Sequence, residues 1–199
     1  MIKKYFFFIL LFFVSTISSQ NQKTTYQTLL NKPIRELSSE QRKSVLLCRL
    51  NELRAEQNKL HPNKKKLLPL KYNTKLEEAC YYFFDHKKKF TESDGKLGEW
   101  MHFCDNGDDL FGRFEAVKVP WIKVLGPNPD DNNRFTSVIS IGENLGDVTY
   151  HTMFEICEAW KNSPGHWIQI ISPAHTHVGF GFRNEGDWII IVTDFAKLE

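Results

Sequence analysis

Three stretches of the chain repeat their apolar residues with the spacing of a helix. The first carries four leucines on one stripe, with charged residues between them: Leu46, Leu50, Leu53 and Leu60. We expect this helix to begin near Ser38 or Ser39. It should end before His61 and Pro62, because the residue ahead of a proline avoids helical backbone angles.

The second and third stretches place apolar residues at i, i+3, i+4 and i+7. They are Leu76, Ala79, Cys80 and Phe83, and then Met153, Ile156, Cys157 and Trp160. Asn73 or Thr74 can cap the second helix. Thr152 and Glu155 have the spacing of a capping box at the start of the third, and the segment 163–165, Ser-Pro-Gly, ends it.

Alternating and β-branched runs predict strands in the second half of the chain. They cover Arg134 to Ile141, His177 to Phe182, and Asp187 to Phe195. Proline, asparagine and aspartate make Gly126 to Asn133 an exposed loop. Helices followed by a mixture that ends in an antiparallel pair indicate a layered α+β domain.

The first residues have the three-part layout of a secretory signal peptide. Lys3 and Lys4 precede an apolar run, Tyr5 to Val14, and a small polar stretch, Ser15 to Gln20. About ten apolar residues are too few for a bilayer that needs roughly twenty. We expect a signal peptide over residues 1–19 and a secreted protein, extracellular or periplasmic. Whether the leader is cleaved or retained as an anchor stays open.

Composition narrows the classes of protein further. Removing residues 1–19 takes two of the 26 lysines and arginines away and leaves 24 basic against 24 acidic residues. This balance gives no electrostatic footprint for nucleic acid. No second apolar run of membrane length follows, so we expect no transmembrane span in the mature chain. The predicted division is a leader, 1–19, a lead-in, 20–44, and one domain, 45–199.

The chain has four cysteines, Cys48, Cys80, Cys104 and Cys157. In an oxidising compartment an even count permits two disulfides, and three pairings are open. Three of the four lie on apolar helical faces, so buried thiols are the competing interpretation. We expect at least one disulfide.

Short motifs follow one another in order over residues 45–196. They are Leu50–Ala55, Leu70–Ala79, Met101–Phe103, Gly142–Leu145 (Gly-Glu-Asn-Leu), Trp160–His166 (Trp-x-x-Ser-Pro-Gly-His) and His177–Phe182. Their order and spacing resemble the CAP/SCP family of cysteine-rich secretory, antigen 5 and pathogenesis-related proteins. We take the Gly-Glu-Asn motif to be a turn. The resemblance implies a three-layer α-β-α sandwich of the α+β class.

The resemblance also implies a cleft lined by two histidines and two acidic residues, which in some members binds zinc or another divalent ion. Carried over residue by residue, His102 matches the first histidine, Glu143 the first acid and His166 the second histidine. Neutral imidazoles and a carboxylate suit Zn²⁺, with room for water in an open position.

The fourth member of this set departs from the family pattern. Its position holds Ser163, and a serine hydroxyl is a poor zinc ligand. Glu155 or Glu158, upstream on the same helix, could supply the carboxylate. We rank Glu155 higher, although the same side chain is placed to close the capping box on Thr152.

Two functions compete. The first is a non-enzymatic binding or signalling module for a lipid, a carbohydrate or a protein. The alternative is a metal-dependent hydrolase, in which a metal on His102 and His166 activates water and Glu143 is the general base. The chain has no Gly-x-Ser-x-Gly motif and no His-Glu-x-x-His motif. We therefore favour the binding module and assign no catalytic residue beyond this role for Glu143.

Overall fold

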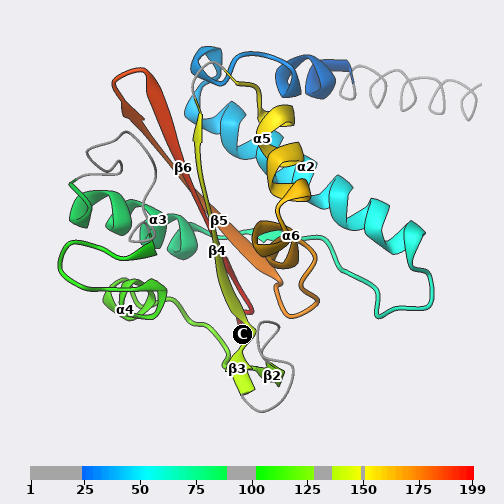
Figure 1. The fold of residues 1–199 in the computed structure, drawn as a ribbon, viewed down its shortest axis with the longest axis vertical. Coiled ribbons are helices and arrows are strands. Elements are labelled where there is room, and N and C mark those ends of the chain that lie inside the picture. The colour runs from blue at the N-terminus through cyan, green and yellow to red at the C-terminus, as the bar shows by residue number, and fades with distance from the viewer. Residues whose placement is uncertain (1–23, 89–101, 128–135, 149–150) are drawn as a thin grey trace, which may run out of the picture.

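A computed structural model describes residues 24–88, 102–127, 136–148 and 151–199 (Figure 1). The predicted signal peptide, Met101 and most of the predicted loop Gly126 to Asn133 lie outside the described residues. In the part of the chain that is described, no helix combines the length and the apolar character that crossing a membrane requires.

A four-stranded mixed sheet forms the centre of the fold, in the order β1-β5-β6-β4. β5 and β6 are the antiparallel pair that the sequence predicts, joined at Gly186, whose φ of 57° favours glycine. β4 is antiparallel to β6, and β1 is parallel to β5. The bounds are Lys71–Tyr72 for β1, Ile141–Val148 for β4, His177–Glu185 for β5 and Trp188–Ala196 for β6.

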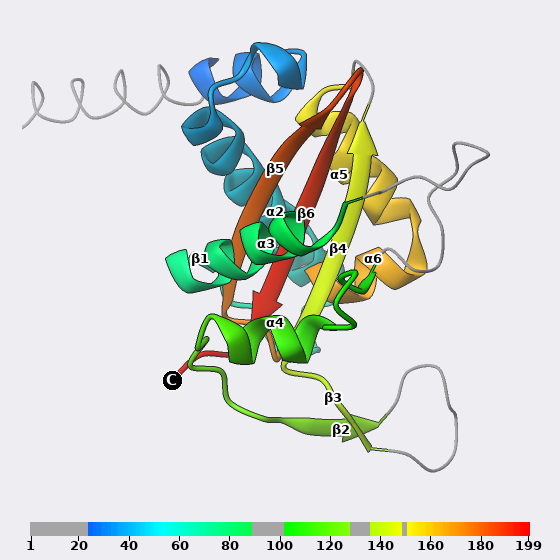
Figure 2. The same ribbon diagram turned by 90° about the vertical axis from the view of Figure 1, so that its left-hand side faces the viewer.

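Helices cover both faces of this sheet, which gives the three-layer sandwich (Figures 1 and 2). One face carries α2 (Ser39–Leu60), α5 (Met153–Asn162) and α6 (Pro164–Ile170). The other carries α3 (Thr74–His86) and α4 (Leu110–Ala116). A short 3-10 helix, η1 (Ile34–Glu36), precedes α2, and β2 (Leu125–Pro127) pairs with β3 (Thr136–Val138) in a separate ribbon.

Side chains that alternate along β6 contribute to the cores on both faces of the sheet. Ile191 and Phe195 belong to the core under α2 and α5, whereas Ile190 and Val192 belong to the core under α3. Because successive strand residues point to opposite faces, Asp194 lies on the side of α3 and α4. An acidic residue is thereby placed inside an apolar layer.

The predicted helix ends agree closely with the structure. Ser38 caps α2 in a capping box with Gln41, and Asn73 caps α3. Thr152 and Glu155 form the predicted box at the start of α5. One residue of the first stripe departs from the prediction: Leu60, in the last turn of α2, is 72% exposed.

Two strand predictions need correction. The predicted strand Arg134 to Ile141 is interrupted, because β3 ends at Val138 and β4 begins at Ile141. The Gly142-Glu143-Asn144 motif lies inside β4 and pairs with β6 residue by residue, so it is strand and not a turn.

The predicted disulfide is not found. All four cysteines are free thiols, and Cys48 is exposed instead of lying on an apolar face. Cys80 projects from α3 into the core on one face of the sheet and Cys157 projects from α5 into the core on the other, so the sheet separates them. Burial raises the pKa of Cys104 to about 11 and that of Cys157 to about 12, which keeps both protonated near neutral pH.

A glycine in β5 sets how closely α3 approaches the sheet. A Cβ atom on Gly179 would lie 2.2 Å from the backbone nitrogen of Glu77 and 2.3 Å from the carbonyl carbon of Leu76. Only glycine leaves room for this helix backbone. The close contact explains why the strand carries glycine where a β-branched residue would otherwise be favoured.

Candidate functional site

The pairing of β4 with β6 places two carboxylates opposite each other. Glu143 is the direct register partner of Asp194. Their side chains are 4% and 0% exposed. Two buried carboxyl groups opposite each other on one face of a sheet cannot both ionise without a positive charge nearby.

Arg113 of α4 supplies that charge. Its Nη2 donates to Glu143 Oε2 and lies 3.4 Å from Asp194 Oδ1. The guanidinium is fully buried, and its central carbon lies 4.6 Å from the ring centre of Phe83. Asp109 starts α4 by accepting from the backbone of Gly112, which fixes the turn that presents Arg113 to the sheet.

His102 completes this cluster from the solvent side. Its Nδ1 lies 2.6 Å from Glu143 Oε1, and 54% of its side chain is exposed. An ionised carboxylate only accepts, so Nδ1 donates and Nε2 is directed away from the carboxylate. We call His102, Glu143, Arg113 and Asp194 the charge cluster.

The two carboxylates of the charge cluster respond differently to burial. Burial alone would raise the pKa of Glu143, but the charge of Arg113 and the hydrogen bond from His102 outweigh it and lower that pKa. Burial dominates at Asp194 and raises its pKa well above the usual range. Of the two carboxylates, Glu143 is therefore the one that carries the negative charge, and Asp194 is the one that favours its protonated form.

His166 lies next to the charge cluster but bonds elsewhere. Its Nδ1 is 2.9 Å from Ser163 Oγ, and its carbonyl accepts from Asn144 of β4 at 3.1 Å. Burial, and to a lesser extent the charge of nearby His102, lowers the pKa of His166, which keeps the ring neutral at pH 7. Ser163, at the position of the fourth acid, thus orients the second histidine.

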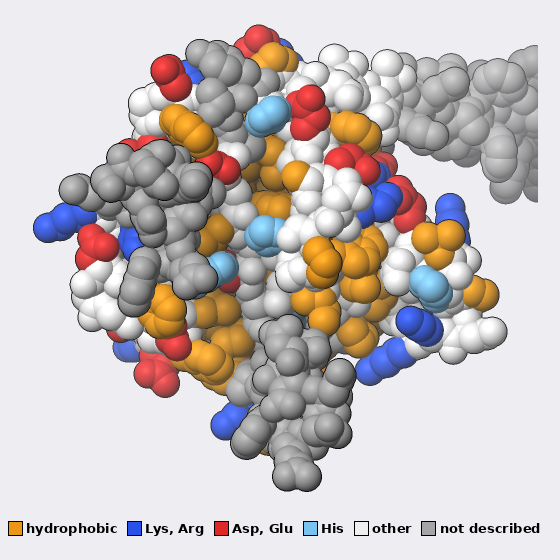
Figure 3. Space-filling model, in the orientation of Figure 1, with side chains coloured by type: hydrophobic (Ala, Val, Ile, Leu, Met, Phe, Trp, Pro, Cys, Tyr) orange, Lys and Arg blue, Asp and Glu red, His pale blue; other side chains and the backbone are white. Residues whose placement is uncertain are grey.

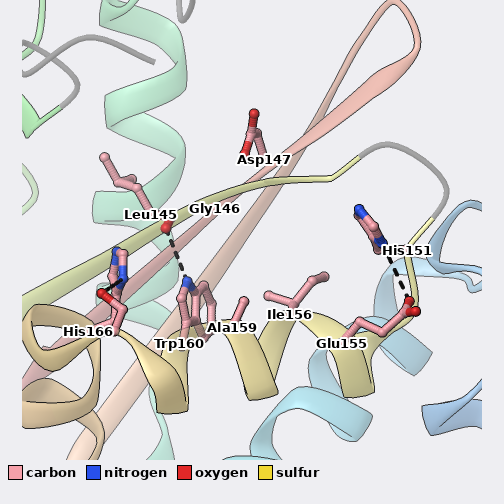
Figure 4. Close-up of a pocket in the computed structure, with 10 residues that line it drawn as sticks. Leu145, Gly146, Asp147, His151, Glu155, Ile156, Ala159, Trp160 and His166 are labelled. Atoms are coloured by element: carbon pink, nitrogen blue, oxygen red, sulfur yellow. Dashed lines mark hydrogen bonds and ion pairs between the residues drawn. The ribbon is translucent and has the colours of Figure 1, made fainter. Parts of the chain in front are cut away.

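The two upstream glutamates point to other partners. Glu155 closes the box on Thr152 and lies 3.5 Å from His151 Nδ1. Glu158 pairs with Arg49 of α2 at 2.8 Å. Figure 4 shows Glu155 and His151 near one end of α5 and His166 beyond its other end, so the length of the helix separates Glu155 from His166.

A groove of about 370 Å³ runs between β4 and the helices α5 and α6. Trp160 lines this groove, and its Nε1 donates to the carbonyl of Leu145 at 3.1 Å, which fixes the ring against β4. Figure 3 shows histidine and hydrophobic side chains around a hollow on this face. The lining is Leu145, Gly146, Ile156, Ala159 and Trp160, with the polar side chains Asp147, His151, Glu155, Ser163 and His166.

The donor set does not fit the zinc site that the sequence suggests. Both carboxylate oxygens of Glu143 are bonded, one to His102 and one to Arg113. Among the described residues, no three histidine, cysteine, aspartate or glutamate side chains converge as metal ligands. His102 and His166 alone would leave a divalent ion two ligands, fewer than zinc sites use.

Sequence reasoning missed Arg113 and Asp194. A signal for Arg113 was available: it shares a short helix with apolar Leu110 and Phe114, and Val117 follows, so a charge stands in an apolar segment. Asp194 likewise interrupts the apolar run of β6. A single buried charge in an apolar element indicates an unseen partner of opposite charge.

Comparison with solved structures identifies proteins that have the same fold. Two solved structures share the fold: an outer surface protein from Borrelia burgdorferi and an extracellular protein containing an SCP domain from Bacillus anthracis. The first has a TM-score of 0.51 and 15% identity, and covers 82% of this chain and 97% of that one. The second has a TM-score of 0.50 and 15% identity, covering 81% of this chain and 44% of that one. No curated protein sequence gives a significant match.

A family model, the cysteine-rich secretory protein family (CAP), matches residues 47–195. This match begins within α2, ends one residue before the end of β6 and takes in His102, Glu143 and His166. Together with the sandwich described above, it shows that the chain belongs to the cysteine-rich secretory protein (CAP) family.

Proposed function

We propose that this chain is a secreted, non-enzymatic binding module whose groove between β4 and α5 takes a small amphipathic, lipid-like ligand. The groove itself carries the proposal. Its volume of about 370 Å³ is in the range of ligand pockets, and its floor is apolar. His166 and Ser163 toward one end, and His151 with Glu155 toward the other, offer polar contacts for a head group.

The leader supports export of the protein. Residues 1–19 have the layout of a signal peptide, and two solved structures with the same fold are described as an outer surface protein and an extracellular protein. Leu145, Ile156, Ala159 and Trp160 give the groove an apolar wall, which favours a ligand with an apolar part over a carbohydrate.

The arrangement of Glu143 argues against the hydrolase. A general base needs a lone pair within reach of the water that it deprotonates, and a pKa near the working pH. Both oxygens of Glu143 are engaged by Arg113 and His102, and its pKa is lowered, so it is a weak base.

Filling the groove tests the proposal. Ala159 is exposed and lines the groove, so Ala159→Phe should occupy the space without disturbing the core. We expect a fluorescent short-chain fatty acid to bind the wild type, and Ala159→Phe to weaken that binding about tenfold or more, measured by fluorescence titration. Asn162→Phe, exposed on the same helix but outside the groove, is the matched control and should bind normally.

Thermal unfolding of both variants verifies that they are folded. Equal affinity in wild type and Ala159→Phe would place the ligand elsewhere. If the wild type does not bind the fatty acid but binds an oligosaccharide or a protein, the lipid-like ligand is contradicted.

A further inference from the structure

Among the described residues, two arginine side chains are fully buried, and they are held in different ways. Arg54 donates to the backbone carbonyls of Leu68, Ile170, Ser172 and His175, at 2.7 to 3.3 Å. Arg113 donates only through Nη2, and only to carboxylates. Within the described residues, Nε and Nη1 of Arg113 and Oδ2 of Asp194 have no hydrogen-bond partner.

This contrast indicates what Arg113 contributes. Leaving buried donors unpaired costs free energy, so hydrogen-bond geometry does not explain the guanidinium. The positive charge of Arg113 explains why it is buried there, because the guanidinium contacts two carboxyl groups that the register of β4 and β6 holds together.

We propose that Arg113 is a built-in cation: it supplies permanently the positive charge that a bound divalent ion would supply beside Glu143. The bonded pair of His102 and Glu143 therefore keeps its arrangement without a metal. A second cation at Glu143 would meet Arg113 in a buried setting where repulsion between like charges is strong. This inference concerns the charge cluster and does not depend on which ligand the groove takes.

The proposal predicts that removing the charge of Arg113 creates a metal site. Without the guanidinium, Glu143 can join His102 as a ligand. His166, whose backbone carbonyl is bonded to Asn144 next to Glu143, can supply a third donor once its side chain turns toward them. Arg113→Met alone leaves two buried carboxylates opposite each other, so the test uses Arg113→Met together with Asp194→Asn. Asp194→Asn alone, which retains Arg113, is the matched control.

The measurement is titration of untagged protein with Zn²⁺ by calorimetry and with Co²⁺ by visible absorbance. Every protein carries Cys48→Ser, because an exposed thiol is itself a metal ligand. We expect the double variant to bind Zn²⁺ at least tenfold more tightly than Asp194→Asn. Adding Glu143→Gln should abolish the gain.

A double variant that is folded and binds Zn²⁺ no more tightly than its control would overturn the proposal. A second measurement needs no variant at Arg113. The melting temperature of the Cys48→Ser protein should be the same in EDTA and in excess Zn²⁺. A rise with zinc that His102→Ala removes would show that the cleft takes a metal with Arg113 in place, which also overturns it.

Discussion

Replacing Glu143 with glutamine is expected to lower the free energy of unfolding by about 3 to 5 kcal/mol at pH 7. Replacing its neighbour Asp194 with asparagine is expected to change it by about 1 kcal/mol or less. The two residues are register partners beside the same guanidinium, so geometry alone would predict similar costs. They differ because Glu143 carries the negative charge that pairs with Arg113, whereas Asp194 favours its protonated form. Glutamine removes the ionised partner of the buried guanidinium, and asparagine replaces a group that favours the neutral form.

The dependence on pH gives this prediction a second readout. The folded-state pKa of Glu143 is lowered, so its stabilising effect is present above the unfolded pKa of about 4.3. That effect is lost as the pH falls through the folded value. Wild type and Glu143→Gln should therefore differ most near neutral pH and converge in acid.

Urea unfolding of wild type and both variants between about pH 3 and pH 7 measures these differences. Equal losses of stability for Glu143→Gln and Asp194→Asn at pH 7 would contradict the assignment of opposite charge states to the two carboxylates. A gap that persists unchanged in acid would contradict it as well.

Arg54→Met is expected to cost about 3 to 5 kcal/mol, through a different mechanism. The guanidinium satisfies four carbonyl oxygens from two segments that flank α2, and methionine would leave the buried ones, those of Ile170 and His175, without a donor. Burial lowers the pKa of Arg54 to about 10, which still leaves it charged at pH 7.

Arg42→Met is the matched control on the same helix. Arg42 is half-buried and donates to one carbonyl, that of Ile34, so its loss should cost about 1 kcal/mol. Similar unfolding midpoints for the two variants in urea would contradict this explanation. Because Arg54 bonds to the end of α6, Arg54→Met should also weaken ligand binding at His166.

The long helices could be predicted from the sequence because their signals are local. Apolar spacing and caps at Ser38, Asn73 and Thr152 locate α2, α3 and α5 within a residue or two. α4 and α6 are seven residues each, which is too short for a repeating apolar face to emerge. Leu60 continues the apolar stripe of α2 and yet is exposed, because periodicity does not show where the part of a helix that packs on the sheet ends.

The candidate site was predictable only in part, for a physical reason. The motifs identified His102, Glu143 and His166, and the structure brings the first two into direct contact, with His166 nearby. The partner that determines the charge of Glu143 is Arg113, which lies on a short helix 30 residues away. The second carboxyl group, that of Asp194, is the register partner of Glu143 on β6. Long-range pairing of this kind leaves no local pattern, so the sequence suggested a metal where the fold provides a guanidinium.

The central claim is that Glu143 is an ionised carboxylate committed to Arg113 and His102. The most direct test follows its side-chain carboxyl carbon by NMR from pH 7 downward, with the signal assigned by its absence from Glu143→Gln. We predict that Glu143 stays ionised to a pKa below the usual value of about 4.3. Protonation at or above that value would show that burial dominates and that the charge cluster does not operate as described.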